Sequence, residues 1–369
     1  MKKYIFISLL TFQTHVKAEK FDRQIISSEV YQLETYNQGN LGICYAVVAA
    51  TLYSSLLNQE NGNLEKIFVS PGILAVYIGL SGYKRQIFKA AKLEDKIFYT
   101  IPGIGWATYL GLRMNYASKN LIELIEGGNL NHSLNDLLTH PTPTIHSLEA
   151  SIIVNGAFGS VKVLISRLYD YIDFFGKQKN VEPDLLTQFL IREKISGNSI
   201  LADILVELDI FLRFKDLPRK KFSGDRLDKR MILLKFLMRH GGPESGPISA
   251  TVRENNYFCR ERLLRKLENH FQDSSSMPVG FSFNLCNLIG SKKERHAVTV
   301  YGKAYLGNKL FFLIRNSWGG KTLREMKEST YILDEQKVVE KTKISGDFWI
   351  SADRFKSICD WRSTLTHLH

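Results

Sequence analysis

The spacing of apolar residues changes once along this chain, and that change constrains the fold more than any other feature. From about residue 129 to 246, apolar residues recur every three or four positions, as in Val161–Phe175, Ile200–Phe214 and Asp228–His240. That spacing predicts amphipathic helices. After about residue 250, one further helix over Arg260–Phe271 leads into short runs of β-type composition. Helices first and strands later predict an α+β fold, not alternating βαβ units.

A single cysteine stands where a predicted helix begins, near the start of the chain. In QGNLGICYAVVAA, Gln38 to Ala50, a glycine-containing polar run leads into Cys44, and a helical stretch follows over Ala46–Asn58. The positive end of a helix stabilises a thiolate, so this position favours a reactive thiol. The side-chain amide of Gln38 and the backbone N–H of Cys44 are the two donors that an oxyanion would need.

The β-type runs place a histidine and an asparagine at the two ends of a predicted hairpin. The stretch HAVTVYGKAYLGNKLFFLIRNSWGG, residues 296–320, begins with His296 and carries Asn316 after its second apolar run. A turn at the Gly-Asn pair between the runs would bring both side chains to one edge. The asparagine would then orient the imidazole, and Trp318 would cover their hydrogen bond. Together with Cys44 these residues are the parts of a Cys–His–Asn nucleophilic site, in which the imidazolium pairs with the thiolate.

These two blocks resemble the papain family of cysteine peptidases. The family pattern Q-G-x-x-G-x-C-[WY]-A is met from Gln38 to Ala46, and the His-Ala-Val and Asn-Ser-Trp-Gly blocks are met from His296 to Val298 and from Asn316 to Gly319. The resemblance implies a helical lobe with Cys44 at the start of its central helix, a β-barrel-like lobe, and a cleft between them. It also implies cysteine-type peptide hydrolysis of a polypeptide substrate without a cofactor, with Trp318 among the substrate-binding residues.

The resemblance further implies a Gly-Gly pair that binds the substrate backbone in the cleft. Gly127 and Gly128 precede a predicted helix, as in the family, and Gly241–Gly242 is a rival pair. Two positions depart from the family. Leu41 replaces a cysteine that often forms a disulfide before the nucleophile, so that bridge is absent. Arg295 replaces the Asp or Asn that often precedes the histidine, which we expect to alter the pH profile.

The interval from Cys44 to His296 is much longer than in the compact domain of the family. We assign the excess to a helical insertion at about residues 129–246 within a peptidase domain that spans residues 19–369. Papain-like enzymes are commonly held inactive by a long N-terminal propeptide. We expect none here, because only about 25 residues separate the expected signal cleavage after Ala18 from Cys44. The insertion is therefore a candidate for capping the cleft, restricting access or docking a partner. The alternative is that it merely packs on the back of the domain.

The first 18 residues have the form of a secretory signal peptide. Lys2 and Lys3 precede an uncharged, largely apolar stretch over Tyr4–Phe12, and Val16–Ala18 offers the small residues of a cleavage site. A buried first strand is the alternative interpretation. Cleavage would remove three lysines and no acid, which lowers the formal net charge from +12 to +9. We therefore expect a secreted or periplasmic protein with no transmembrane segment after signal removal.

A dense part of the positive charge lies between Arg213 and Arg230, where eight basic residues meet three acidic ones. No recognised nucleic-acid motif accompanies this run, so we expect no nucleic-acid partner. A solvated loop and helix face is the ordinary interpretation. An acidic partner or an anionic surface is the functional one.

The chain contains four cysteines, which are too few for a disulfide scaffold at this length. If Cys44 is kept as a thiol, then Cys259, Cys286 and Cys359 allow one bridge and one free thiol, and the sequence leaves the pairing open. No CxxC motif or clustered His/Cys spacing is present, so we expect no metal site.

Three functions are compatible with these residues. The first is an exported endopeptidase that uses Cys44 and His296. The second is an amidase or acyl-transferring relative that uses the same residues on a non-peptide amide. The third is a catalytically inactive binding protein on the same fold. The presence of Gln38 and Asn316 beside the first two residues argues against the third function.

Overall fold

In the computed structural model, the described residues form stretches that cover both the cysteine segment and the β-type runs. They are residues 22–31, 33, 36, 38, 42–61, 68–79, 123, 125–139, 161–178, 182–197, 199–214, 226–240, 250–256, 260–284, 295–317, 347–359 and 363–368. The predicted signal peptide lies outside them. No helix in this described part of the chain combines the length and the hydropathy of a membrane span.

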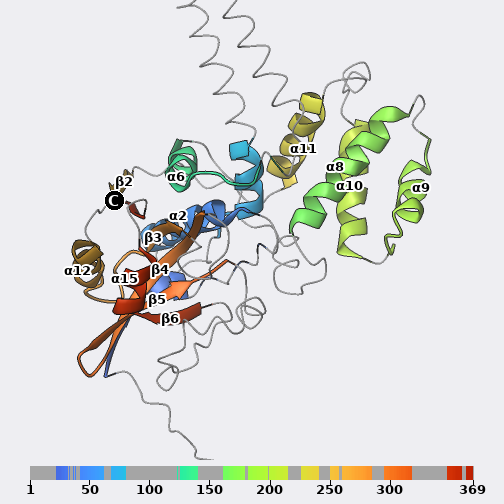
Figure 1. Cartoon of the computed structure of the whole chain (residues 1–369). Coiled ribbons are helices and arrows are strands. Elements are labelled where there is room, and N and C mark those ends of the chain that lie inside the picture. The colour runs from blue at the N-terminus through green and yellow to red at the C-terminus, as the bar shows by residue number, and fades with distance from the viewer. Residues whose placement is uncertain are drawn as a thin grey trace, which may run out of the picture.

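One antiparallel sheet organises the part of the fold drawn at the lower left of Figure 1. Its main path runs β2-β7-β3-β4-β5-β6, and β1 pairs with β4 beside that path. The strands are β1 (Arg23–Ile26), β2 (Val252–Asn256), β3 (Val279–Asn284), β4 (Arg295–Leu306), β5 (Lys309–Arg315), β6 (Asp347–Ser351) and β7 (Thr364–Leu368). Helices together with an antiparallel sheet confirm the predicted α+β class.

The hairpin of β4 and β5 has the turn that the sequence predicts. Leu306 pairs with Lys309 at its tip, which leaves Gly307 and Asn308 as the two-residue turn. Gly307 has a φ of +54°, a left-handed conformation that glycine adopts without steric cost. The same pairing brings the start of β4 and the end of β5 to one edge of the sheet, where His296 and Asn316 lie.

The helix α2 (Cys44–Asn61) begins at the predicted cysteine and packs on the sheet through β4, β3 and β7. Every residue of this helix from Tyr45 to Asn58, except Leu56, is buried, which is the pattern of a helix inside the core. Gly280 on β3 permits this close packing, because a Cβ at that position would lie 2.7 Å from Leu130 and 3.2 Å from Val48 and Leu52.

In the described part of the chain, several short helices lie around the sheet. They are α1 (Ser28–Tyr31), α6 (Leu130–Thr139), α12 (Arg260–His270) and α15 (Ala352–Ile358), and residues 71–79 are also helical. α6 packs against α2, whereas α12 and α15 cover a second core. Alternation along β4 explains the two cores, since Ala297 belongs to the α2 core while Val298 and Val300 belong to the other.

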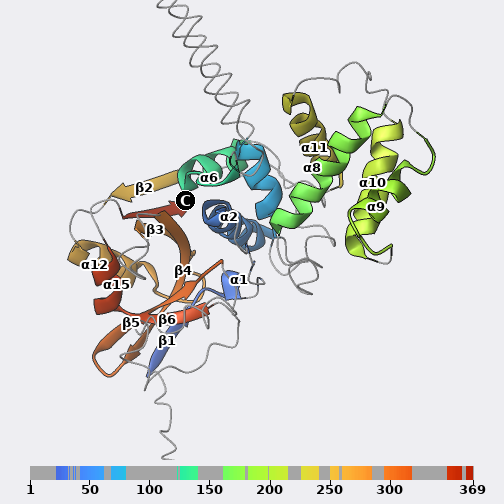
Figure 2. The same cartoon turned by 45° about the vertical axis from the view of Figure 1, so that its right-hand side comes forward.

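The remaining helices form a separate helical lobe, drawn in green and yellow in Figure 2. They are α8 (Val161–Lys177), α9 (Leu185–Arg192), α10 (Ile200–Phe214) and α11 (Arg226–His240). One continuous buried cluster includes residues of all four helices and of α2, so the lobe packs against the α2 side of the fold. α6 lies within the predicted insertion at 129–246 but packs on α2. Among the described helices, α8 is therefore the first that belongs to the lobe.

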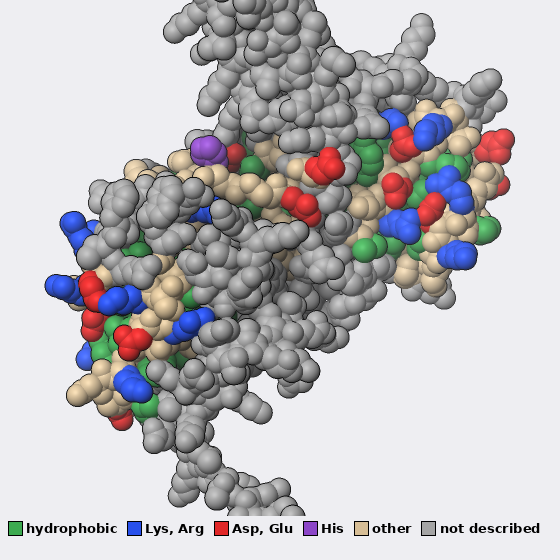
Figure 3. All heavy atoms as spheres, viewed as in Figure 1, with side chains coloured by type: hydrophobic (Ala, Val, Ile, Leu, Met, Phe, Trp, Pro, Cys, Tyr) green, Lys and Arg blue, Asp and Glu red, His purple; other side chains and the backbone are tan. Residues whose placement is uncertain are grey.

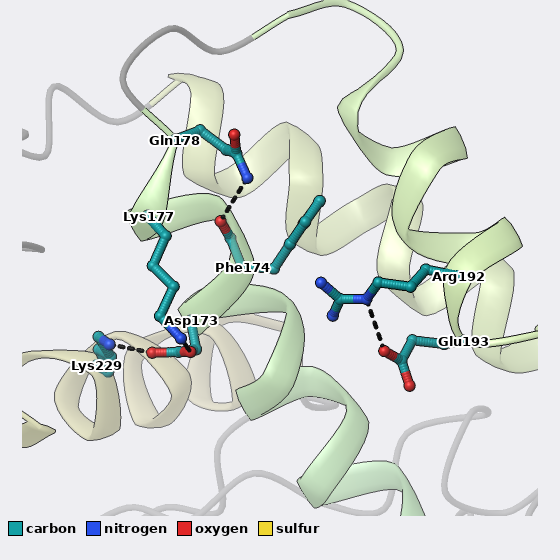
Figure 4. Close-up of polar contacts among 7 residues, drawn as sticks. All are labelled: Asp173, Phe174, Lys177, Gln178, Arg192, Glu193 and Lys229. Carbon is teal, nitrogen blue, oxygen red and sulfur yellow. Dashed lines mark hydrogen bonds and ion pairs between the residues drawn. The ribbon is translucent and has the colours of Figure 1, made fainter.

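Part of the basic run between Arg213 and Arg230 is used inside this lobe. Figure 4 shows Lys229 paired with Asp173, which also pairs with Lys177. Arg213 donates to Asp209 at 2.6 Å and to the backbone carbonyl of Glu182 at 2.9 Å.

Arg230, at the end of the same run, is only 2% exposed. Three of the eight basic residues, Arg213, Lys229 and Arg230, thus have structural roles inside the lobe. Over the face of the lobe in Figure 3, the described basic and acidic side chains are mixed together. The prediction of an acidic partner therefore depends on residues 215–225 and on the side chain of Arg226, which lie outside the described set.

Candidate active site

Cys44 is the first residue of α2, and backbone N–H groups surround its sulfur. The first turn of the helix closes on Ile43, whose carbonyl accepts from the N–H groups of Ala46 and Val47 at 2.9 and 3.1 Å. Burial raises the pKa of the Cys44 thiol. Hydrogen bonds from the backbone of Ala297, of Tyr45 and of Cys44 itself act against that rise. The thiol thus lies between a helix N-terminus and the backbone that directly follows His296.

His296 is held from behind by Asn316. Its Nε2 lies 2.9 Å from Oδ1 of Asn316, and both side chains are 4% exposed. Because the asparagine oxygen is an acceptor, this contact places the ring hydrogen on Nε2 and leaves Nδ1 as the basic nitrogen. Phe283 packs edge-on against the ring, with centroids 5.8 Å apart.

Burial works against charge on both members of this pair. It lowers the pKa of His296 to about 4, although the bond to Asn316 acts in the opposite direction. It also raises the pKa of Cys44, as noted above. The sequence predicts a thiolate–imidazolium ion pair. In the structure, burial favours the neutral imidazole of His296, and desolvation raises the pKa of the Cys44 thiol although its side chain is only partly buried.

Cys44 and His296 line the same pocket, which has a volume of about 100 Å³. The other lining residues are Tyr45 from α2, Arg295 and Ala297 from β4, Ser282 from β3, Thr364 from β7, and residues 128–131 at the start of α6. Ligand pockets commonly measure about 300–1,000 Å³. The pocket is therefore sized for a small group such as one side chain. None of the described residues of the helical lobe lines it.

The predicted glycine pair lies beside the cysteine loop. Gly127 donates from its backbone N–H to the carbonyl of Gly42 at 3.0 Å, and Glu126 accepts a long bond from the N–H of Gly42 at 3.5 Å. Gly127 has a φ of +74°, which favours glycine at this turn. The loop before α6 is thus joined to the loop before α2.

Gly128 lies against the ring of Tyr45, where an added Cβ would overlap the ring atoms. The Tyr45 hydroxyl donates to the carbonyl of Ile125 at 2.6 Å, which fixes the ring under the glycine loop. Gly128 also lines the pocket. The rival pair Gly241–Gly242 lies outside the described residues, so no comparison between the two pairs follows.

Gln38 lies next to the site but is not among the lining residues of the pocket. It is 3% exposed, and its backbone N–H donates to the carbonyl of Ser317 at 2.8 Å. The hydroxyl of Ser317 donates to the side-chain oxygen Oε1 of Gln38. Since the amide oxygen accepts this bond, the Nε2 group is the donor end of the side chain, as an oxyanion donor requires. Trp318 follows directly and lies outside the described residues.

Several polar residues at the site were not predicted from the sequence. Ser317 belongs to the Asn-Ser-Trp-Gly block, which is the only sequence signal that points to a role for it. Asn131, Ser282 and Thr364 line the pocket from three elements that are distant in sequence. Their spacing contains no pattern that would have brought them together.

The described residues contain no group of three or more His, Cys, Asp or Glu side chains that could hold a metal ion. Besides Cys44, the described residues include Cys359, which is buried and whose sulfur lies 3.2 Å from the carbonyl of Phe355. Cys259 and Cys286 lie outside the described residues, so the pairing of the cysteines stays open.

No protein-family model matches the chain, and no curated protein matches it either. Among solved structures, the chain is similar to PepW from Lactobacillus rhamnosis HN001 (DR20), a crystal structure determined as the selenomethionine derivative. The identity is 9%, the TM-score is 0.41, and the match covers 96% of this chain and 82% of that chain. This similarity is too distant to indicate a function for the present chain. The functional proposal therefore rests on the residues and geometry described above.

Proposed function

We propose that the protein is a papain-like cysteine peptidase that cleaves peptide bonds with Cys44 as the nucleophile. One observation carries the proposal. Cys44, at the start of α2, and His296 line a single pocket. The imidazole of His296 is held by Asn316, whose Oδ1 lies 2.9 Å from its Nε2. These are the residue types that nucleophilic acyl transfer by a thiol needs. The glycine loop at the pocket edge supports the same function, because it leaves backbone groups close to the thiol.

In the first half of the reaction, Nδ1 of His296 takes the thiol proton as the sulfur of Cys44 attacks the carbonyl carbon of the substrate. A C–S bond forms, and the carbonyl oxygen becomes an oxyanion. The backbone N–H of Cys44 and the amide of Gln38 donate to that oxygen. The C–N bond then breaks, and His296 returns its proton to the leaving amine.

In the second half, His296 takes a proton from a water molecule that attacks the thioester carbon. The C–O bond forms, the C–S bond breaks, and the proton returns to the sulfur. The products are a carboxylic acid and the restored thiol. Asn316 keeps the imidazole in the tautomer that both halves need, since its oxygen accepts from Nε2 throughout.

Because burial favours the neutral forms of Cys44 and His296, the proposed reaction starts from a thiol and not from a preformed ion pair. Proton transfer then accompanies attack, with His296 acting as a general base. The backbone N–H groups around the sulfur stabilise the negative charge that develops during this step.

An epoxysuccinyl thiol probe tests the proposal directly. We expect it to label Cys44 and to block hydrolysis of unselective peptides. Cys44→Ala and His296→Ala should each abolish hydrolysis without unfolding the protein. Cys359→Ala is the matched control, because it removes a buried cysteine that does not line the pocket. Labelling that persists in Cys44→Ala and disappears in Cys359→Ala would contradict the proposal.

Non-peptide amides belong in the same assay. An amidase with this site would release amine from small amides and leave peptides intact, and such a result would move the proposal to the second class of enzyme. Labelling of Cys44 without hydrolysis of either kind of substrate would instead favour a binding protein.

A further inference from the structure

The pocket beside Cys44 contains one arginine among its described lining residues, Arg295. Arg295 is the first residue of β4 and directly precedes His296, and its backbone is paired with Asn284 of β3. Its side chain is exposed and yet borders the pocket, so it stands at the mouth. A ligand that places a group next to the thiol would meet this guanidinium.

The other ionisable lining groups are neutral near pH 7. Burial lowers the pKa of His296 to about 4 and raises the pKa values of Cys44 and Tyr45. Glu126 is close enough to act on Tyr45, but it lies on the Gly42 side and is not among the lining residues. The described lining therefore carries a single positive charge, that of Arg295.

Hydrogen-bond donors line the wall of the pocket below this charge. Thr364, Ser282 and Ala297 are register partners across β7, β3 and β4, so their side chains lie in one row on the same face of the sheet. The two hydroxyl-bearing residues of that row, Ser282 and Thr364, line the pocket.

Asn131, at the start of α6, also lines the pocket and contacts β7. Its side-chain oxygen accepts from the hydroxyl of Thr366 at 2.9 Å, which makes its NH₂ group the donor end. The described lining thus includes a guanidinium, two hydroxyls and an amide, each of which can donate a hydrogen bond. A carboxylate accepts hydrogen bonds from all three kinds of donor and pairs most strongly with a guanidinium.

We propose that this pocket binds a substrate carboxylate next to the cleaved bond and that Arg295 is the specificity-determining residue. The position relative to the cleaved bond rests on the proposed function, whereas carboxylate binding does not. Two sources supply the same chemistry, namely an Asp or Glu side chain and the free C-terminal carboxylate of a peptide.

Matched peptides separate these sources. One set carries Asp, Asn or Lys at each position around the cleaved bond, and a second set differs only in a free or an amidated C-terminus. Arg295→Gln should lower kcat/KM for the preferred carboxylate peptides roughly ten- to a hundredfold, with little effect on the neutral ones. Arg295→Glu should reverse the preference in favour of Lys. Arg265→Gln is the control, because Arg265 is exposed on α12 and does not line the pocket.

A binding measurement keeps this inference distinct from the peptidase proposal. Calorimetry on Cys44→Ala, with and without Arg295→Gln, should show tighter binding of carboxylate peptides only when Arg295 is present. If wild type and Arg295→Gln treat Asp and Asn peptides alike in both assays, the inference is overturned while hydrolysis stands. If no peptide is cleaved but Arg295-dependent binding remains, the carboxylate site stands and the peptidase proposal falls.

Discussion

Ser317 and Gln38 hold each other by two hydrogen bonds. The Ser317 hydroxyl donates to the side-chain oxygen of Gln38, and the backbone N–H of Gln38 donates to the carbonyl of Ser317 at 2.8 Å. Ser317 directly follows Asn316, which holds His296. Consecutive residues at the end of β5 thus position the proposed general base and the proposed oxyanion donor.

This relationship predicts that Ser317→Ala acts through Gln38. Gln38→Ala should lower kcat by roughly 10²–10³-fold, as loss of one oxyanion donor typically does. Ser317→Ala should lower kcat by a smaller factor and leave KM nearly unchanged, because the amide is kept but loses its fixed orientation. Steady-state kinetics on an unselective peptide measure both values.

The double variant provides the control for that interpretation. Once Gln38 is replaced, Ser317→Ala has no amide to orient and should cost little more. Additive losses in kcat would show that Ser317 acts on stability or on another group, and not through Gln38.

His296 should make the free energy of unfolding depend on pH. Its pKa is about 4 in the folded protein, against the usual 6.5 that applies to the unfolded chain. Between these values the unfolded chain binds more protons, so stability falls as the pH falls from about 6.5 to 4. The full shift corresponds to ~3 kcal/mol. Urea unfolding of the wild type and of His296→Gln, between pH 7 and 4.5, measures this contribution.

His296→Gln should unfold with a weaker dependence on pH over that range, because the buried imidazole is gone. His132→Gln serves as the control, since His132 is exposed on α6 and its loss should leave the slope of the wild type intact. If the free energy of unfolding changed with pH as steeply in His296→Gln as in the wild type, the neutral, buried state of the imidazole would be contradicted.

Arg315 joins the end of β5 to the segment that precedes Gln38. It donates to both carboxylate oxygens of Asp347 at 3.0 Å and to the backbone carbonyls of Val30 and Leu33 at 2.7 Å. Both side chains of the ion pair are almost fully buried. Asp347→Ala would leave the guanidinium buried without its counter-charge, so we expect a loss of about 3–5 kcal/mol in the free energy of unfolding.

An exposed ion pair gives the comparison for that value. Lys356 pairs with Glu261 across two helices, and both side chains are well exposed. Lys356→Ala should cost at most about 1 kcal/mol. Chemical unfolding of both variants measures the difference, and equal losses would mean that burial of the Arg315–Asp347 pair adds nothing.

Local patterns predicted those parts of the site that depend on neighbouring residues. The apolar run after Cys44 placed the thiol at the start of α2, and the Gly-Asn pair between the β-type runs placed the turn of the hairpin. α8, α10 and α11 likewise lie at or within two residues of their predicted bounds. Period and turn chemistry are properties of short segments, so they are visible in the sequence.

Long-range contacts were not predictable in the same way. Strand β7 lies between β2 and β3 in the sheet, and its pairing with β3 brings Thr364 beside Ser282. The bond from Ser317 to Gln38 likewise joins opposite ends of the chain. The neutral state of Cys44 and His296 follows from burial, which depends on the packing of the whole fold.

Gly128 should be intolerant of a side chain. A Cβ there would overlap the ring of Tyr45, which the bond to the Ile125 carbonyl fixes. Gly128→Ala should therefore displace either the glycine loop or the ring next to Cys44. We expect it to raise KM and lower kcat/KM by at least about tenfold, since small misplacements near a reacting group are costly. Peptide kinetics, with thermal unfolding to monitor the fold, measure the effect.

Gly127→Ala separates this steric effect from backbone strain. Gly127 has a φ of +74° but has open space where a Cβ would lie, so alanine there should cost about 1 kcal/mol of stability through strain alone. We expect Gly127→Ala to lower the unfolding temperature and to keep most of the activity. Gly128→Ala should do the reverse, with a larger loss of kcat/KM than of stability. If both variants lose activity in proportion to stability, the glycine loop acts only as part of the fold.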